Sequence, residues 1–127
     1  MPFTTDKIFY ETHGHGTPVV LLHGLGRSSR AWFGFETQVA RDYCAITIDN
    51  RGIGRSKDAP ISLMTGMDAF ANDVIAVLDA LQIEYAHILG ISFGGMVALQ
   101  AAMAHKNRVT SIAVLASSIA GTRALRL

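Results

Sequence analysis

The feature that most constrains the fold is a glycine-rich pentapeptide, Gly90-Ile91-Ser92-Phe93-Gly94, between a short apolar run and a helical segment. The run at 87–89 is typical of a buried strand, and the apolar spacing behind the pentapeptide predicts a helix over 93–105. A turn this sharp strains Ser92, and residues with a Cβ in place of the glycines would clash. It also places the serine hydroxyl at a helix N-terminus, where the dipole and free N–H groups favour developing negative charge. The pattern predicts a strand-turn-helix unit with a projecting serine, and its alternative is an ordinary glycine-rich turn.

The rest of the chain alternates short apolar runs with helical segments. Strands are expected over 8–12, 18–22, 44–48 and 109–115. One helix is expected over 30–41, with Ser28 or Ser29 as its N-cap. A second helix is expected to follow a capping box formed by Thr65 and Asp68. The second of these carries an apolar stripe at helical spacing: Phe70, Val74, Val77, Leu78 and Leu81. Such alternation predicts an α/β fold with a predominantly parallel sheet and flanking helices, and ligands bind such sheets at the carboxyl ends of the strands.

Composition limits the class of protein. A chain of 127 residues has room for a single domain over 1–127, and 50% hydrophobic against 17% charged residues excludes a disordered chain. The net charge is +1 with scattered basic residues, so no nucleic acid or anionic membrane partner is expected. The single cysteine, Cys44, argues against a disulfide framework and a zinc-thiolate site. We find no secretory leader and no membrane-spanning run, which predicts a cytoplasmic protein.

Two further loops follow buried strands at the same sheet edge. In His23-Gly24-Leu25-Gly26, Gly24 allows close approach of the backbone, so the Leu25 N–H could join the Phe93 N–H as an oxyanion hole. The loop that begins at Asp49-Asn50-Arg51 is expected to be structural. Its glycines supply positive φ angles, and Asp49 and Arg51 bind backbone groups. A direct catalytic role for Asp49 or Arg51 is the alternative.

In this order and at these separations, His-Gly-x-Gly, Asp-x-Arg-Gly-x-Gly-x-Ser and Gly-x-Ser-x-Gly-Gly resemble the α/β-hydrolase superfamily, from about residue 8 to about residue 120. Ser92 matches the nucleophile of that family, and Leu25 and Phe93 match its oxyanion-hole donors. The stretch 73–81 with the turn at Ser92 is similar to the esterase and enol-lactonase branch. The resemblance implies a serine hydrolase that cleaves small carboxylic esters or lactones through an acyl-enzyme, with no cofactor and no metal. Supporting roles in the loops are implied for His23, Gly24, Gly26, Asp49, Arg51, Gly90, Gly94 and Gly95.

The base and the acid of the family pattern have no match here. The family's triad runs in the order Ser, acid, His, whereas the 35 residues after Ser92 hold His105 and no Asp or Glu. The resemblance therefore covers the N-terminal half of the family and lacks its C-terminal strands. His87 and His105 are expected far from Ser92. His23 is the remaining candidate for a makeshift base, and bracing its own loop is the competing interpretation.

The missing strands also predict a partner. Strand 109–115 would be an unprotected apolar edge, so we expect a homo-oligomer or association with a complementary C-terminal half. A non-catalytic oligomerising domain on the hydrolase scaffold is one alternative function. A nucleotide-binding module is another, but Gly24-Leu25-Gly26 lacks the final glycine of a dinucleotide fingerprint, and Met96 stands where a phosphate-binding loop needs lysine. A His13-x-His15 metal site is weaker than a plain turn.

Overall fold

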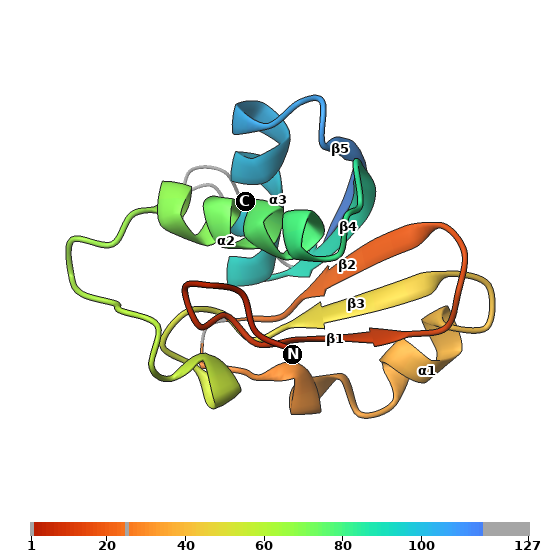
Figure 1. Cartoon of the computed structure of the whole chain (residues 1–127), viewed down its shortest axis with the longest axis horizontal. Coiled ribbons are helices and arrows are strands. Elements are labelled where there is room, and N and C mark those ends of the chain that lie inside the picture. The colour runs from red at the N-terminus through yellow and green to blue at the C-terminus, as the bar shows by residue number, and fades with distance from the viewer. Residues whose placement is uncertain (1, 25, 116–127) are drawn as a thin grey trace, which may run out of the picture.

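A computed structural model describes residues 2–24 and 26–115 and shows one five-stranded sheet (Figure 1). The strand order is β1-β3-β2-β4-β5. β1 pairs antiparallel with β3, and the other three pairings are parallel. The predicted α/β class with a predominantly parallel sheet is confirmed. The strands are β1 (Tyr10–His13), β2 (Pro18–Leu22), β3 (Cys44–Ile48), β4 (Ala86–Ile91) and β5 (Val109–Leu115).

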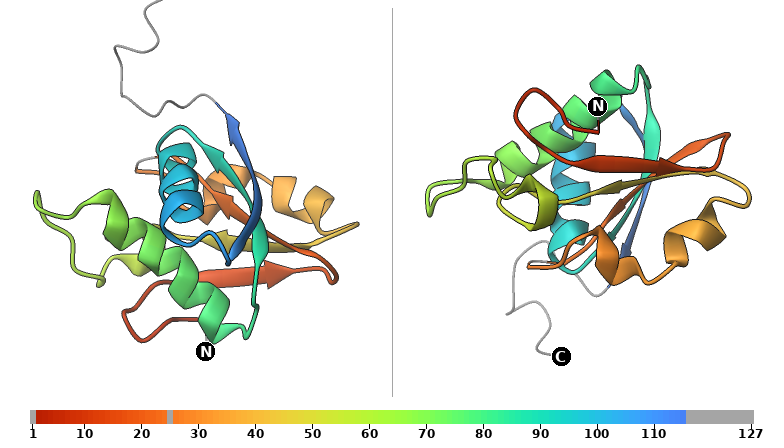
Figure 2. Two further views of the ribbon diagram at one scale, coloured as in Figure 1. Left: turned by 90° about the horizontal axis from the view of Figure 1, so that it is seen from above. Right: turned by 60° about the horizontal axis from the view of Figure 1, so that its bottom comes forward.

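Helices cover both faces of the sheet, which explains why β2, its central strand, is apolar throughout. α2 (Met67–Ala80) and α3 (Phe93–Ala104) lie on one face, and the short α1 (Phe35–Val39) lies on the other (Figure 2). In β2, Val20 and Leu22 join the core under α2 and α3, whereas Leu21 packs with Trp32 on the α1 side. Successive side chains of a strand point to opposite faces, so a strand covered on both sides needs a continuous apolar run.

The predicted stripe on α2 is buried as expected, but the helix begins differently. Phe70, Val74, Val77 and Leu78 lie in the core. The N-cap residue is Gly66, not Thr65. The Thr65 hydroxyl instead accepts a hydrogen bond from the Ser62 N–H at 2.9 Å, which holds it in the preceding turn. The predicted capping box is therefore wrong, because the threonine stabilises the turn rather than the helix.

Two other predicted elements need correction. In place of one helix over 30–41, a 3-10 helix, η1 (Ser29–Trp32), is followed by a break and then by α1. The break consists of Phe33 and Gly34, with φ angles of 50° and 90°, left-handed values that end a right-handed helix. The first strand begins at Tyr10 rather than Ile8, because Phe9 forms an isolated bridge with Phe3. A second 3-10 helix, η2 (Gly54–Ser56), follows β3.

β5 is an edge strand. Its only neighbour in the described sheet is β4, on the side away from β1 (Figure 2). Its side chains are half-buried or exposed, and Leu115 keeps 52% of its surface accessible. The sequence predicted a buried strand with an unprotected edge. The edge position is confirmed within the described residues, but the predicted burial is wrong, because β4 is the one strand among those residues that pairs with β5.

Candidate functional site

Ser92 occupies a strained turn between β4 and α3. It is the N-cap of α3, with φ 54° and ψ −119°, and its side chain is exposed. Positive φ is costly for a residue that carries a Cβ. The backbone is held on both sides, since the Ser92 N–H donates to the Leu115 carbonyl at 2.8 Å and the Ser92 carbonyl accepts from the Gly95 N–H at 2.9 Å. The serine hydroxyl therefore projects from a fixed bend at a helix N-terminus.

The glycines around Ser92 permit two backbone contacts that a larger residue would block. A Cβ at Gly90 would collide with the Gly94 carbonyl group. A Cβ at Gly94 would collide with the Leu22 carbonyl oxygen and lie 2.7 Å from that of His23. The first turn of α3 thus rests directly on the carboxyl end of β2. Gly95 is buried next to this contact.

Two segments border the serine where an oxyanion would develop. Phe93 is the first residue of α3, so its N–H belongs to the donors without an intrahelical acceptor. Gly24 is buried against the turn, and a Cβ there would lie 3.6 Å from Ser92 Cβ and 3.9 Å from Ser92 Oγ. Leu25, the second predicted donor, lies outside the described residues. Gly26, which follows it, has a φ of 76°, a value that favours glycine.

His23 is engaged by its own loop. Its Nδ1 accepts a hydrogen bond from the Gly24 N–H at 2.7 Å, and its ring packs edge-on against Trp32 at 4.8 Å. Burial lowers the pKa of His23, and the nearby charge of Arg27 lowers it further. A hydrogen bond with the Ala31 backbone raises this pKa but does not offset the other two effects. Burial and the Arg27 charge both favour the neutral ring. No hydrogen bond within the described residues joins it to Ser92, so the structure does not form the makeshift Ser92–His23 pair.

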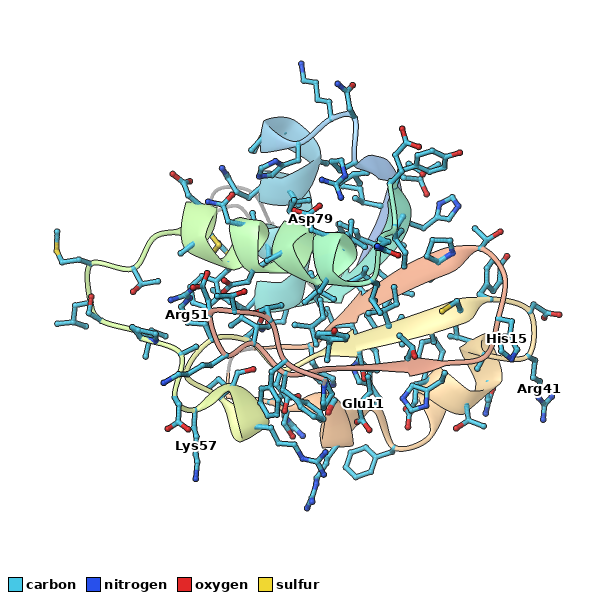
Figure 3. The ribbon with its side chains drawn as sticks, viewed as in Figure 1. Glu11, His15, Arg41, Arg51, Lys57 and Asp79 are labelled. Carbon is cyan, nitrogen blue, oxygen red and sulfur yellow. The ribbon has the colours of Figure 1, made fainter. Side chains whose placement is uncertain are left out.

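The remaining histidines considered from sequence also have other partners or positions. His105, at the far end of α3, contacts Asn72 Oδ1 through Nε2 at 2.9 Å. His87 Nδ1 lies 2.6 Å from Ser111 Oγ on β5. His15 lies by the turn between β1 and β2 (Figure 3). This turn is at the opposite edge of the sheet from the carboxyl ends of β2 and β3. Among the residues that the structure describes, no histidine is hydrogen-bonded to the Ser92 hydroxyl.

Asp49 fixes the loop after β3. Its carboxylate is buried and accepts hydrogen bonds from the Ser29 N–H at 2.6 Å and the Arg55 N–H at 3.0 Å. These contacts join the loop after β2 to the loop after β3. A Cβ at Gly54 would lie 2.6 Å from Asp49 Oδ2, and Gly54 has a φ of 54°. The Asp49 carboxylate therefore has structural contacts, because both of its oxygens accept hydrogen bonds from backbone N–H groups of these loops.

Arg51 holds the same loop against α2. Its Nε and Nη2 donate to the two carboxylate oxygens of Asp73 at 3.0 and 2.7 Å, and its Nη1 donates to the Pro60 carbonyl at 2.7 Å. Burial raises the pKa of Asp73, and the Arg51 hydrogen bonds and charge oppose that rise. Bonding to Asp73 raises the pKa of Arg51. Asp73 was not predicted as the partner, although its helical spacing to Phe70 and Val77 places it beside the apolar stripe, where a carboxylate needs one.

In residues 2–24 and 26–115, no group of three His, Cys, Asp or Glu side chains is placed to hold a metal ion. Within the same part of the chain, no helix combines the length and the apolar character that crossing a bilayer requires.

Comparison with known proteins identifies relatives over most of the chain. The alpha/beta hydrolase fold family matches residues 17–126. A pimeloyl-[acyl-carrier protein] methyl ester esterase of Aeromonas hydrophila is 36% identical over 112 residues, which is 88% of this chain and 42% of the relative. A 2-hydroxymuconate semialdehyde hydrolase of Pseudomonas sp. is 33% identical over 108 residues, 83% of this chain and 38% of the relative.

Solved structures agree with these relatives. The structure of Est816, an N-acyl homoserine lactone degrading enzyme, superposes with a TM-score of 0.77 and 37% identity. That superposition covers 87% of this chain and 42% of the other. The chain spans about two-fifths of the length of the relatives it matches. With the family match over residues 17–126 and the strained serine turn between β4 and α3, the chain belongs to the alpha/beta hydrolase fold family, among relatives that include esterases and meta-cleavage product hydrolases.

Proposed function

We propose that this chain carries the nucleophile of a serine hydrolase that acts on small carboxylic esters or lactones through an acyl-enzyme on Ser92. The observation that carries the proposal is the strained, exposed Ser92 at the N-terminus of α3. Relatives whose names specify a methyl ester or a lactone support this substrate class.

The chemistry follows from the surroundings of Ser92. Its Oγ attacks the carbonyl carbon of the substrate, and the carbonyl oxygen takes up the negative charge of the tetrahedral intermediate. The Phe93 N–H, with that of Leu25 as the proposed second donor, stabilises this charge. Each such donor lowers the barrier by about 3–4 kcal/mol. The C–O bond to the leaving oxygen then breaks, that oxygen takes a proton, and water hydrolyses the acyl-enzyme. In a lactone the leaving oxygen stays attached to the acyl group.

The general base and the acid of the reaction are proposed to come from outside the described residues. A serine hydroxyl is a weak nucleophile until a base removes its proton. His23 is engaged by Gly24 and Ala31, and no carboxylate follows Ser92 in the sequence. A complementary C-terminal segment that approaches the carboxyl ends of β4 and β5 would reach the serine.

Covalent labelling tests the nucleophile. A fluorophosphonate probe is expected to label Ser92, and Ser92→Ala should abolish that label in peptide mass spectra. Labelling needs no deacylation step, so it reports how far the Ser92 hydroxyl is activated by the oxyanion donors and by any base that a partner chain supplies. We expect Ser92 to react at least about tenfold faster than any other serine, because an oxyanion donor contributes about 10²–10³ in rate.

Ser111→Ala is the matched control. Ser111 is exposed and contacts His87 at 2.6 Å, the single Ser–His hydrogen bond among the described residues. Its removal should leave the Ser92 label unchanged. A label on Ser111 and none on Ser92 would show that the nucleophile is assigned wrongly. No label on either serine, together with a defined oligomer, would favour a non-catalytic oligomerising domain.

A further inference from the structure

The loop after β2 is held by one side chain at each of its ends. At the far end the Ser29 N–H donates to the Asp49 carboxylate at 2.6 Å, and Asp49 keeps 1% of its surface accessible. At the near end the Gly24 N–H donates to Nδ1 of His23 at 2.7 Å. Loss of the near contact leaves the far one in place. A change at His23 therefore acts on the end of the loop that borders Ser92.

Gly24 is the residue through which this loop meets the turn at Ser92. It is buried, and a Cβ built on it would lie 3.6 Å from Ser92 Cβ and 3.9 Å from Ser92 Oγ. Its carbonyl accepts from the Arg27 N–H at 3.1 Å, so both of its main-chain polar groups have partners. The amide after Gly24 is the proposed second oxyanion donor. Because a peptide group is planar, the direction of that donor would follow the Gly24 carbonyl.

The contact between His23 and Gly24 requires a neutral imidazole. A neutral ring has one donor nitrogen and one acceptor nitrogen, whereas an imidazolium donates from both. Since Nδ1 accepts from the Gly24 N–H, the ring proton belongs on Nε2. A second proton on Nδ1 would place two N–H donors face to face across 2.7 Å. Trp32 packs edge-on against the ring at 4.8 Å and restricts its rotation, so protonation should displace Gly24.

The surroundings of the ring determine when it takes up that proton. Burial and the charge of Arg27, in the same loop, lower the pKa of His23 below its ordinary value of about 6.5. Of the elements packed nearby, η1 carries the exposed Arg30 and α1 carries Glu36, whereas β2 and the first turn of α3 carry no charge. The ring is therefore protonated as the pH falls below about 6.5.

We propose that His23 is a positioning residue for the oxyanion donors and that protonation of its ring switches the site off. Neutral His23 holds Gly24 against the turn at Ser92, so that the amide after Gly24 can meet the oxygen of the tetrahedral intermediate. The imidazolium releases Gly24, and this donor is lost. The inference rests on the proposed function of Ser92. Because one oxyanion donor contributes about 10²–10³ in rate, its displacement should slow acylation at least about tenfold.

Nuclear magnetic resonance on the ¹⁵N-labelled full chain tests the contact without catalysis. An N–H···N hydrogen bond transmits a scalar coupling, so we expect one between the Gly24 amide nitrogen and His23 Nδ1 near pH 8. The coupling should disappear as the ring titrates, with a midpoint below about 6.5. His105→Asn is the matched control, because His105 lies at the far end of α3, and it should leave both results unchanged. A missing coupling near pH 8, or no titration above about pH 4.5, would overturn the proposal.

Labelling of Ser92 by the fluorophosphonate near pH 7.5 tests the consequence. His23→Phe keeps an aromatic ring against Trp32 but offers the Gly24 N–H no acceptor. It should keep its circular dichroism spectrum and label at least about tenfold more slowly. His23→Asn supplies an oxygen that accepts without titrating and should recover part of the lost rate. Equal rates in His23→Phe and the unaltered chain would overturn the proposal.

The two measurements separate this inference from the proposed function. If Ser92 is labelled but the coupling between Gly24 and His23 is absent, this inference alone is contradicted. If Ser92 is labelled in none of the chains, the proposed function is contradicted, and the positioning role of His23 with it.

Discussion

Gly94→Ala is expected to destabilise the fold by about 3 kcal/mol, because a single added methyl group would meet the backbone of β2. The added Cβ would collide with the Leu22 carbonyl oxygen and would lie 2.7 Å from the His23 carbonyl oxygen. Backbone atoms in the centre of a sheet cannot move aside as a flexible side chain can. The first turn of α3 would have to lift off the sheet, and the support of Ser92 would lift with it.

Urea denaturation followed by circular dichroism measures this loss. Gly66→Ala is the matched control, because a Cβ there meets nothing within 4 Å. Its effect should stay below about 1 kcal/mol, the range of an N-cap exchange. A loss at Gly94→Ala no larger than that at Gly66→Ala would show that α3 is not packed on β2 as described.

Arg51→Met should destabilise the fold by about 3–5 kcal/mol, since it leaves a buried carboxylate without its partner. Asp73 keeps 7% of its side-chain surface accessible, and Arg51 keeps 14%. The two hydrogen bonds between them, with a third from Arg51 to Pro60, fasten the loop after β3 to α2. Without the guanidinium, the loop and the helix lose this connection and Asp73 is left desolvated.

The loss should depend on pH in a defined direction. Burial already raises the pKa of Asp73 in the folded chain, and removal of Arg51 raises that pKa further. A carboxyl whose pKa is higher in the folded than in the unfolded state binds its proton more tightly when folded, so stability falls as pH rises through the folded pKa. The difference from the unaltered chain should therefore be larger at pH 7 than near pH 4.5. An equal loss at both pH values would contradict this origin.

Two further variants separate the buried charge from general damage. Asp73→Asn in the Arg51→Met background should recover part of the stability, because it removes the uncompensated charge. Asp79→Asn removes the ion pair between Asp79 and Arg108. The Asp79 side chain is 62% exposed. That substitution should cost less than about 1 kcal/mol.

Much of the fold could be predicted from sequence because its signals are local. The apolar runs at 18–22 and 44–48 became β2 and β3 with the predicted bounds. The turn at Ser92 was also predictable, since Gly90 and Gly94 are required by contacts within one strand-turn-helix unit and with the adjacent β2. The break at Gly34 was not predicted, because the apolar spacing continues through it and hides the change of backbone direction.

The sequence by itself determined the order of strands and helices, the strained position of Ser92 and the family match, because these follow from backbone sterics and apolar spacing over a few neighbouring residues. Only the tertiary structure decided how the side chains pair. It joined Arg51 to Asp73, hydrogen-bonded the His23 ring to the Gly24 N–H of its own loop, and placed β5 at the edge of the described sheet. Those outcomes depend on which elements meet in space, and spacing along the chain does not record distances between elements that are remote in sequence.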